Sequence, residues 1–160
     1  MARNILRPVE VISGKEGDVY VKIGENRYHY MHLKEIEAVV EYQKGEVPML
    51  GRKMTGHKIN GMNGSYKGSG YYRFSEERKL AEAYKNGEAA PIWEIEITNV
   101  DQSTTAGVQR VVLKDCMPDS TVLGKANAED EFLEEDFEGT FDDFEIVESF
   151  SSSMDGYIES

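Results

Sequence analysis

Apolar and polar residues alternate along most of the chain, and this alternation limits the fold more than any other feature. A period of two places successive side chains on opposite faces of a β-strand, so each such run indicates a half-buried strand. The clearest run is WEIEIT at residues 93–98, which follows Pro91. The same reasoning predicts strands at 19–23, 28–31, 36–42 and 108–116, and a shorter one at 121–123. The chain is therefore predicted to be mainly β.

One segment, residues 76–86, is predicted to be a helix. Leu80, Ala83 and Tyr84 have the i, i+3, i+4 spacing of an apolar helical stripe. Ser75 is a suitable N-cap residue, and the Asn86-Gly87 pair is a typical helix end.

The acidic segment 131–147 allows two interpretations. Its apolar residues follow helical spacings of 4, 4, 3 and 3 between Leu133 and Val147. Like-charged i, i+4 pairs and the poor helix formers Gly139 and Thr140 argue against a helix. Two short strands with a bulge between them also fit the segment, so both structures stay open at this point.

Charge is strongly segregated along the sequence. The net charge is −12, with 18 Lys and Arg residues against 30 Asp and Glu residues. Residues 126–160 contain 13 of the acids and no Lys or Arg, whereas no acid occurs between Glu46 and Glu76. A chain with one basic and one acidic segment is suited to self-association as well as to a foreign partner.

The basic segment is also rich in glycine. Residues 51–70 contain six glycines, which weaken an isolated strand and leave its register poorly fixed. We expect a long, flexible basic ribbon here, with strand character at one or both ends. A connection of this length is usually functional or disordered.

Residue patterns for catalysis or cofactor binding are weak. The single cysteine, Cys116, excludes an intrachain disulfide and a cysteine-rich zinc site. Residues 51–58 resemble a phosphate-binding loop, but His57 and Lys58 occupy its Lys and Ser/Thr positions. The three histidines have no matching ligand set and are expected on strand surfaces. We expect no catalytic residue, no metal and no cofactor.

Membrane and secretion signals are not expected either. No apolar run approaches the roughly 20 residues of a membrane span, and the N-terminus does not resemble a signal peptide. These patterns are typical of a soluble cytosolic protein.

Several motifs, taken in order, resemble one known family. They are Ile12–Gly17, Gly51–Lys58, an Asn63-Gly64 turn, Glu134-Glu135 and Phe141–Glu145. Over residues 12–148 the chain resembles the tail tube protein of contractile-tailed phages. The resemblance is greatest to the tube proteins of defective prophages and R-type, phage-tail-like bacteriocins.

The resemblance implies an antiparallel β-sandwich or barrel-like core with one flanking helix. It also implies a long glycine-rich hairpin loop at about 44–68 that reaches neighbouring subunits. Residues 1–160 would form a single tail tube domain with an N-terminal arm (1–12) and a C-terminal tail (151–160). The resemblance favours strands for the acidic segment and implies no catalytic residues.

The expected function is structural. Members of the family form hexameric rings that stack into the hollow inner tube of a contractile tail, a conduit for DNA or ions through the target cell envelope. The expected partners are copies of the chain itself, the tail sheath, a tape-measure protein in the lumen, the baseplate and tail terminator proteins, and passing DNA bound without sequence specificity. The protein would be made in the bacterial host cytoplasm and assembled into a virion tail or a bacteriocin particle.

Two alternatives remain open from the sequence. A β module could bind polyanions such as nucleic acid through the basic segment 51–73, where tyrosines could stack on bases. A secreted effector tube of the type VI kind would have the same expected fold.

Two sets of residues are candidates for the structural role. The ribbon is expected to contact a neighbouring subunit, and some acids of the 94–148 region are expected to line the bore. The contact candidates are Arg52, Lys53, Met54, Thr55, Gly56, His57, Lys58, Asn63 and Lys67. The bore candidates are Glu94, Glu96, Glu134, Glu135, Asp136 and Glu138.

Overall fold

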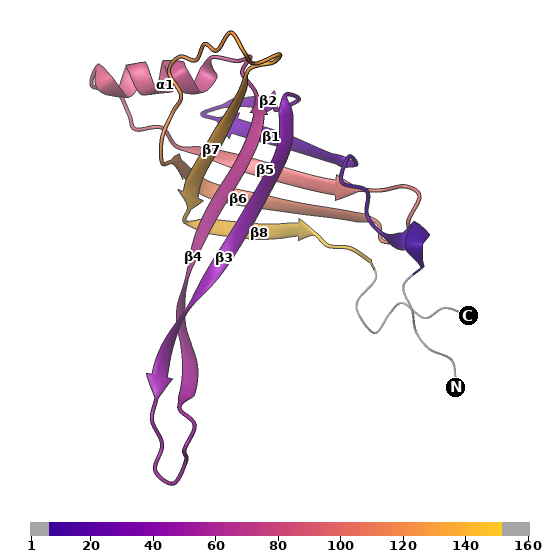
Figure 1. Ribbon diagram of the computed structural model, residues 1–160, viewed down its shortest axis with the longest axis vertical. Helices are drawn as coiled ribbons and strands as arrows, with labels where there is room; N and C mark the ends of the chain where they lie inside the picture. Colours follow the sequence, from indigo (N-terminus) through magenta and orange to yellow (C-terminus); the bar gives the residue numbers. More distant parts are fainter. Residues whose placement is uncertain (1–6, 152–160) are drawn as a thin grey trace. The chain divides into compact units, whose positions relative to one another are not determined.

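The computed structural model describes residues 7–151, and within them the chain is mainly β, with antiparallel strands and one α-helix (Figure 1). The elements are η1 (Pro8–Glu10), β1 (Gly17–Ile23), β2 (Asn26–His29), β3 (Leu33–Val47), β4 (Gly56–Tyr71), α1 (Glu76–Lys85), β5 (Trp93–Val100), β6 (Val108–Pro118), β7 (Glu134–Phe141) and β8 (Asp143–Glu148). The mainly-β prediction is confirmed. Residues 1–6 of the expected arm and 152–160 of the expected tail lie outside the described residues.

The chain divides into two compact units that alternate along the sequence. The first consists of residues 7–31, 93–114 and 144–151, and the second of residues 32–92 and 115–143. β6 begins in the first unit and ends in the second.

In the first unit, β1 pairs with β2 on one side and with β5 on the other, both antiparallel. β6 follows β5 in the sheet, and β8 pairs with β6. The apolar set of the period-two pattern forms the core, where Val21, Ile95 and Leu113 are almost completely buried. A turn at Gly24, which has a positive φ of 63°, joins β1 to β2.

In the second unit, the strand order is β6, β7, β4, β3. β4 pairs with β7 only through Gly64–Tyr71, whereas its pairing with β3 continues to the Val47–Gly56 pair. The β3–β4 hairpin therefore extends beyond β7 as a two-stranded arm, seen in Figure 1. A register shift between Gln43 and Lys44 marks a bulge in this arm.

Most of the glycine-rich segment is a strand and not a loop, because β4 begins at Gly56. Only residues 48–55 lie between β3 and β4, so the expected loop at 44–68 is much too long. A Cβ atom at Gly64 or Gly68 would lie closer than 3.0 Å to the ring of Phe141 or Phe137, respectively. These glycines leave space for aromatic side chains from β7, an arrangement that compensates the low strand propensity of glycine.

Some of the other local predictions are confirmed, and others are wrong. α1 and the two strands of the acidic end are present as expected, and Gly87 ends α1 with a φ of 94°. Ser75 occupies the N-cap position but makes no side-chain capping hydrogen bond. The expected strand at 121–123 is not formed. The prediction of a turn at Asn63-Gly64 is wrong, because both residues lie within β4, opposite Glu41 and Val40.

Candidate assembly interface

The end of the β3–β4 hairpin exposes large apolar side chains beside basic ones. Leu50 is fully exposed, and Met49 and Met54 are 58% and 76% exposed. The backbone N–H of Arg52 donates to the carbonyl oxygen of Met49 at 3.4 Å, closing a turn in which Gly51 has a φ of 78°. Such a turn favours glycine at that position. We refer to residues 47–58 as the hairpin tip.

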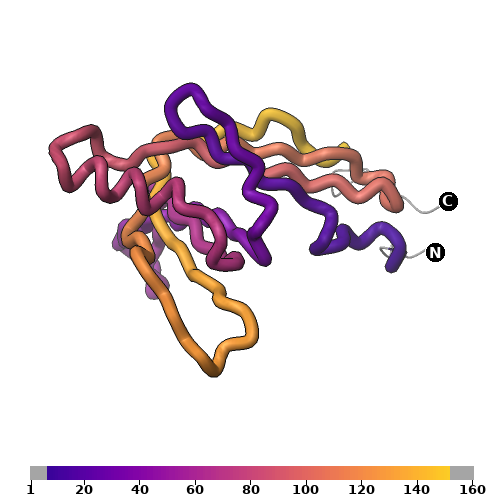
Figure 2. The backbone as a smooth tube through the Cα atoms, turned by 90° about the horizontal axis from the view of Figure 1, so that it is seen from above, coloured from indigo at the N-terminus to yellow at the C-terminus, as the bar shows by residue number. Residues whose placement is uncertain are grey.

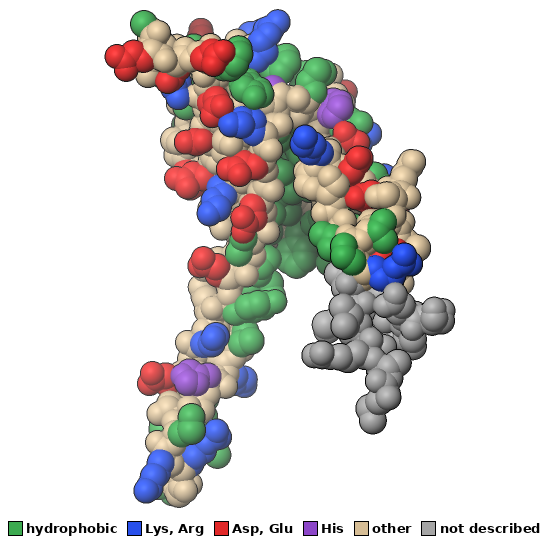
Figure 3. All heavy atoms as spheres, turned by 45° about the vertical axis from the view of Figure 1, so that its right-hand side comes forward, with side chains coloured by type: hydrophobic (Ala, Val, Ile, Leu, Met, Phe, Trp, Pro, Cys, Tyr) green, Lys and Arg blue, Asp and Glu red, His purple; other side chains and the backbone are tan. Residues whose placement is uncertain are grey.

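The predicted contact residues do not all lie in one place. Seven of them belong to the hairpin tip: Arg52, Lys53, Met54, Thr55, Gly56, His57 and Lys58. The last three are also the first residues of β4. Figure 3 shows basic and apolar side chains together at this end of the hairpin.

Asn63 and Lys67 lie elsewhere, on the part of β4 that carries acidic neighbours. Lys67 is opposite Glu37 of β3 on one side and Glu138 of β7 on the other. Asn63 is opposite Glu41. These two candidates are therefore separated from the hairpin tip along β4.

One face of the β3–β4–β7 sheet is strongly acidic. Because residues directly opposite each other on neighbouring strands lie on the same face, the register places the acids around Lys67 and Ser69 together. They are Glu35, Glu37, Glu41, Glu134, Asp136 and Glu138. We call this surface the acidic sheet face. Lys34 neutralises part of it, since its Nζ lies 2.8 Å from Oε1 of Glu134.

The bore candidates of β7 do not all point the same way. Glu134, Asp136 and Glu138 lie on the acidic sheet face, but Glu135 lies on the other face of β7, as strand alternation requires. Its Oε2 is 2.5 Å from a guanidinium nitrogen of Arg78 on α1, and both side chains are largely buried. Sequence reasoning missed Arg78, because no spacing relates a helix residue to a strand 57 residues away.

Arg78 connects α1 to several groups of the second unit. It also donates a hydrogen bond to the carbonyl oxygen of Phe74, and its guanidinium lies 4.3 Å from the ring centre of Tyr72. Burial raises the pKa of Glu135, although the positive charge of Arg78 opposes that shift. The carboxylate is thus held at a desolvation cost that the ion pair only partly offsets.

The two bore candidates of β5 belong to the first unit. Oxygens of Glu96 lie 3.0 Å from Arg27 and 3.1 Å from Arg110, and Arg110 also pairs with Glu148 at 2.8 Å. The charge of Glu96 is therefore compensated within the chain. Glu94 lies opposite Lys22 in the β1–β5 register.

The histidines are placed partly as expected. His29 of β2 stacks on Tyr20 with ring centres 4.7 Å apart, and His57 is exposed on β4. His32 differs, because it lies in the connection before β3, half-buried against Phe74. That burial lowers the pKa of His32. Residues 7–151 contain no group of three or more His, Cys, Asp or Glu side chains placed to hold a metal ion. No helix within that range has the length and apolar character of a membrane span.

Comparison with known proteins decides the family. A family described as phage tail tube protein matches residues 4–148. The chain belongs to the phage tail tube protein family. It is therefore a structural protein of a phage tail or a phage-tail-like particle.

Two Bacillus subtilis proteins are similar to this tail tube protein over nearly its whole length. The phage-like element PBSX protein XkdM is 36% identical over 149 residues, which are 93% of this chain and 99% of XkdM. YqbM is 34% identical with the same coverage of both chains.

Solved structures share the fold at much lower identity. A chain of the anti-feeding prophage baseplate superimposes with a TM-score of 0.63 at 12% identity, covering 89% of this tail tube protein and 97% of that chain. A chain of the sheath–tube complex of an extracellular contractile injection system, PVC, gives 0.57 at 10% identity, with coverage of 81% and 88%.

Proposed function

We propose that this tail tube protein polymerises into stacked hexameric rings that form the hollow inner tube of a contractile tail or R-type bacteriocin. The hairpin tip carries the proposal: it holds exposed Met49, Leu50 and Met54 next to uncompensated positive charge. Apolar side chains gathered with charges on an extended arm are typical of a contact surface. The six-fold symmetrised anti-feeding prophage baseplate, which contains a chain of the same fold, supports rings of six.

The acidic sheet face is the proposed wall of the bore. Lys34 and Lys67 offset only part of the charge of its six acids. A negative wall repels DNA phosphates over about 8 Å at physiological ionic strength, and the same wall favours cations. The bore residues proposed are therefore Glu134, Asp136 and Glu138. Glu135 is not among them, because it pairs with Arg78 on the opposite face.

The proposed partners follow from this role. A tube inside a contractile tail must contact the sheath outside, a tape-measure protein inside, and the baseplate and terminator at its ends. Chains of the same fold occur in a sheath–tube complex and in the tube-terminating cap of the anti-feeding prophage. Synthesis in the host cytoplasm and assembly into a tail or bacteriocin particle complete the proposal.

Electron microscopy of the purified protein tests the assembly. We expect rings or tubes with six-fold symmetry, and a protein that stays monomeric at high concentration would refute the proposal. The bore is tested with assembled tubes of the Asp136→Lys/Glu138→Lys variant. These tubes should retain DNA at low salt, whereas wild-type tubes should not. Equal retention by both would remove these residues from the bore.

A further inference from the structure

Two surfaces of the second unit carry charged side chains that no ion pair compensates within the described residues. One is the hairpin tip with Arg52, Lys53 and Lys58, and the other is the segment between β6 and β7, residues 119–133, here called the β6–β7 loop. In the β6–β7 loop, Glu129, Asp130 and Glu131 are consecutive and exposed. Within residues 7–151, none of these six charged side chains takes part in an ion pair.

Each surface also exposes large apolar side chains. Leu123 and Phe132 of the β6–β7 loop are 72% and 67% exposed. On the hairpin tip, Leu50 and Met54 are even more exposed. The two surfaces are therefore complementary in charge, since one is basic and the other acidic, and both expose apolar side chains that could pack together.

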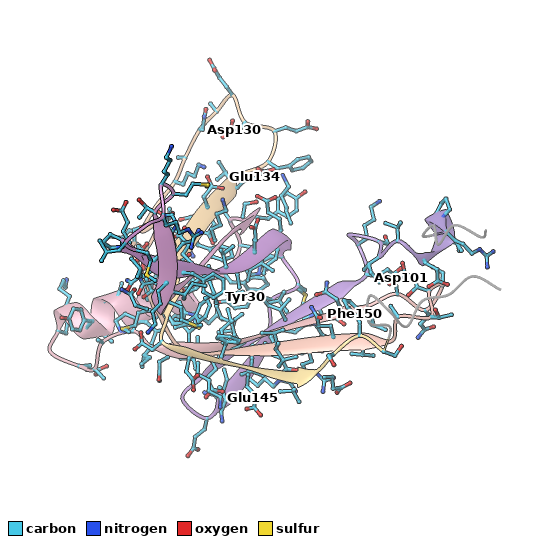
Figure 4. The ribbon with its side chains drawn as sticks, turned by 90° about the horizontal axis from the view of Figure 1, so that it is seen from below. Tyr30, Asp101, Asp130, Glu134, Glu145 and Phe150 are labelled. Atoms are coloured by element: carbon cyan, nitrogen blue, oxygen red, sulfur yellow. The ribbon has the colours of Figure 1, made fainter. Side chains whose placement is uncertain are left out.

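The β6–β7 loop is attached firmly at its ends. The N–H of Asp119 donates to the carbonyl oxygen of Glu138 at 2.9 Å, and the N–H of Tyr72 donates to that of Leu133 at 3.0 Å. Nζ of Lys125 donates to the carbonyl oxygen of Glu134 at 2.6 Å. Figure 4 shows Asp130 out on this loop, beyond the start of β7 where Glu134 lies, and Figure 2 shows the loop in orange. A loop of this length with anchored ends is usually functional.

The two surfaces lie at opposite ends of one strand. The hairpin tip includes the first residues of β4, Gly56 to Lys58, whereas the β6–β7 loop adjoins the last residues of β4, because Tyr71 is opposite Glu134. β4 has 16 residues, which span about 50 Å at the rise of an extended strand. The hairpin tip therefore cannot reach the β6–β7 loop of its own chain.

Other acidic surfaces fit the hairpin tip less well. The exposed strand β8 offers Phe144 and Ile146, but its acids Glu145 and Glu148 already pair with Lys114 and Arg110. The acidic sheet face also carries acids, but lysine, serine and threonine side chains lie between them along its strands.

We propose that the hairpin tip of one copy docks on the β6–β7 loop of a second copy. Leu50 and Met54 pack against Phe132 and Leu123, and the three basic residues face the three acids. Because donor and acceptor are unlike surfaces of one chain, the contact is heterologous and repeats from copy to copy. This contact rests on the proposed self-assembly and names the surface that receives the hairpin.

Cross-linking in assembled particles locates the contact. Two separately tagged variants, Leu50→Cys and Phe132→Cys, are mixed, assembled and treated with a short bismaleimide. We expect a mixed dimer at least about ten-fold more abundant than from Leu50→Cys with Ile146→Cys, which probes β8 instead. Native Cys116 is fully buried and does not compete. Equal yields, or a link to position 146 alone, would overturn the contact.

Charge reversal tests its specificity. Replacing Arg52, Lys53 and Lys58 by Glu should reduce assembly at least about ten-fold, because like charges then face each other. Adding Glu129→Lys, Asp130→Lys and Glu131→Lys restores opposite charges and should restore assembly. A matched control reverses three exposed lysines elsewhere: Lys15, Lys22 and Lys85.

The outcomes separate this contact from the proposed function. Wild-type protein that forms no rings or tubes refutes both. Wild-type tubes with no rescue in the combined variant, or with equal loss in the lysine control, refute the contact and leave tube formation intact. A melting temperature equal to that of the wild-type protein confirms that each variant is folded.

Discussion

The ion pair between Arg78 and Glu135 offers a quantitative test of how α1 is held on its unit. Their side chains are only 15% and 14% exposed, and the two charged atoms are 2.5 Å apart. Removing one partner of a buried pair costs about 3–5 kcal/mol, because the other charge stays desolvated. Since both groups retain some access to solvent, we expect about 3 kcal/mol for Glu135→Leu. For a chain of this size, that loss lowers Tm by about 6–12 °C.

The double variant should behave differently. Burial raises the pKa of Glu135 in spite of Arg78, so desolvating the carboxylate costs more than the pair returns. Arg78→Met with Glu135→Leu should therefore lie within about 1 kcal/mol of the wild-type protein or exceed its stability. Urea unfolding of the monomer, analysed as a double-mutant cycle, measures the coupling.

The pH dependence supplies an independent check. A folded-state pKa above the ordinary 4.5 means that the stability from protonated Glu135 is present at low pH and is lost as the pH rises through the raised value. Glu135→Gln should remove this part of the pH dependence. If the single Leu variant melted within 2 °C of the wild-type protein, as an exposed pair would allow at roughly 0–1 kcal/mol, the reasoning would be wrong.

Three further changes probe other features. Gly64→Ala should cost about 1–3 kcal/mol in urea unfolding, because its Cβ would meet the ring of Phe141, whereas Gly124→Ala, with open space around it, should be nearly neutral; equal effects would disprove the steric explanation. Asp101→Asn should lower Tm near neutral pH, because hydrogen bonds from Ser103 and Ser13 lower the pKa of Asp101, and the difference should shrink as the pH falls below 3.8; a difference independent of pH would contradict this. Leu50→Ser should leave monomer stability within about 0.5 kcal/mol, since Leu50 is fully exposed, and a large loss would mean that it packs within its own chain.

The strands were predictable because alternation is a local property. Residues 93–98 carry enough period-two signal to indicate a strand with its buried face, and residues 36–42 enough to indicate a strand, in which Tyr42 of the apolar set is nevertheless exposed. The helix α1 has its own stripe and end signals. The acidic segment was ambiguous from its residues, because its apolar spacing fits helix and strand alike. Pairing of β7 with β4 and of β8 with β6 decides it, and the β4–β7 pairs join residues more than 60 positions apart.

The glycine-rich segment shows why the rest of the fold was harder to predict from the sequence. Taken alone, glycine at 64 and 68 indicates flexibility or a turn, and the Asn63-Gly64 turn was one of the motifs that carried the family resemblance. In the fold, rings from β7 occupy the space above these glycines. Glu135 is a different case: strand alternation already placed it on the other face of β7 from Glu134 and Asp136, but its ion-pair partner Arg78 on α1 left no trace in the local sequence. The single-domain assignment stays a prediction.

The length of β4 fixes the distance between two surfaces of the subunit. It fixes how far the basic end of the arm lies from the loop at the other end. If the proposed contact forms, the paired length of β3 and β4 would therefore set the spacing between successive copies. Adding two residues to each of β3 and β4 in the arm would lengthen that spacing by about 7 Å and keep every side chain on its face. Adding a single residue to each strand would move the side chains of the rest of the arm to the opposite face of the hairpin. In the proposed assembly, subunit spacing could therefore be altered only in steps of two residues.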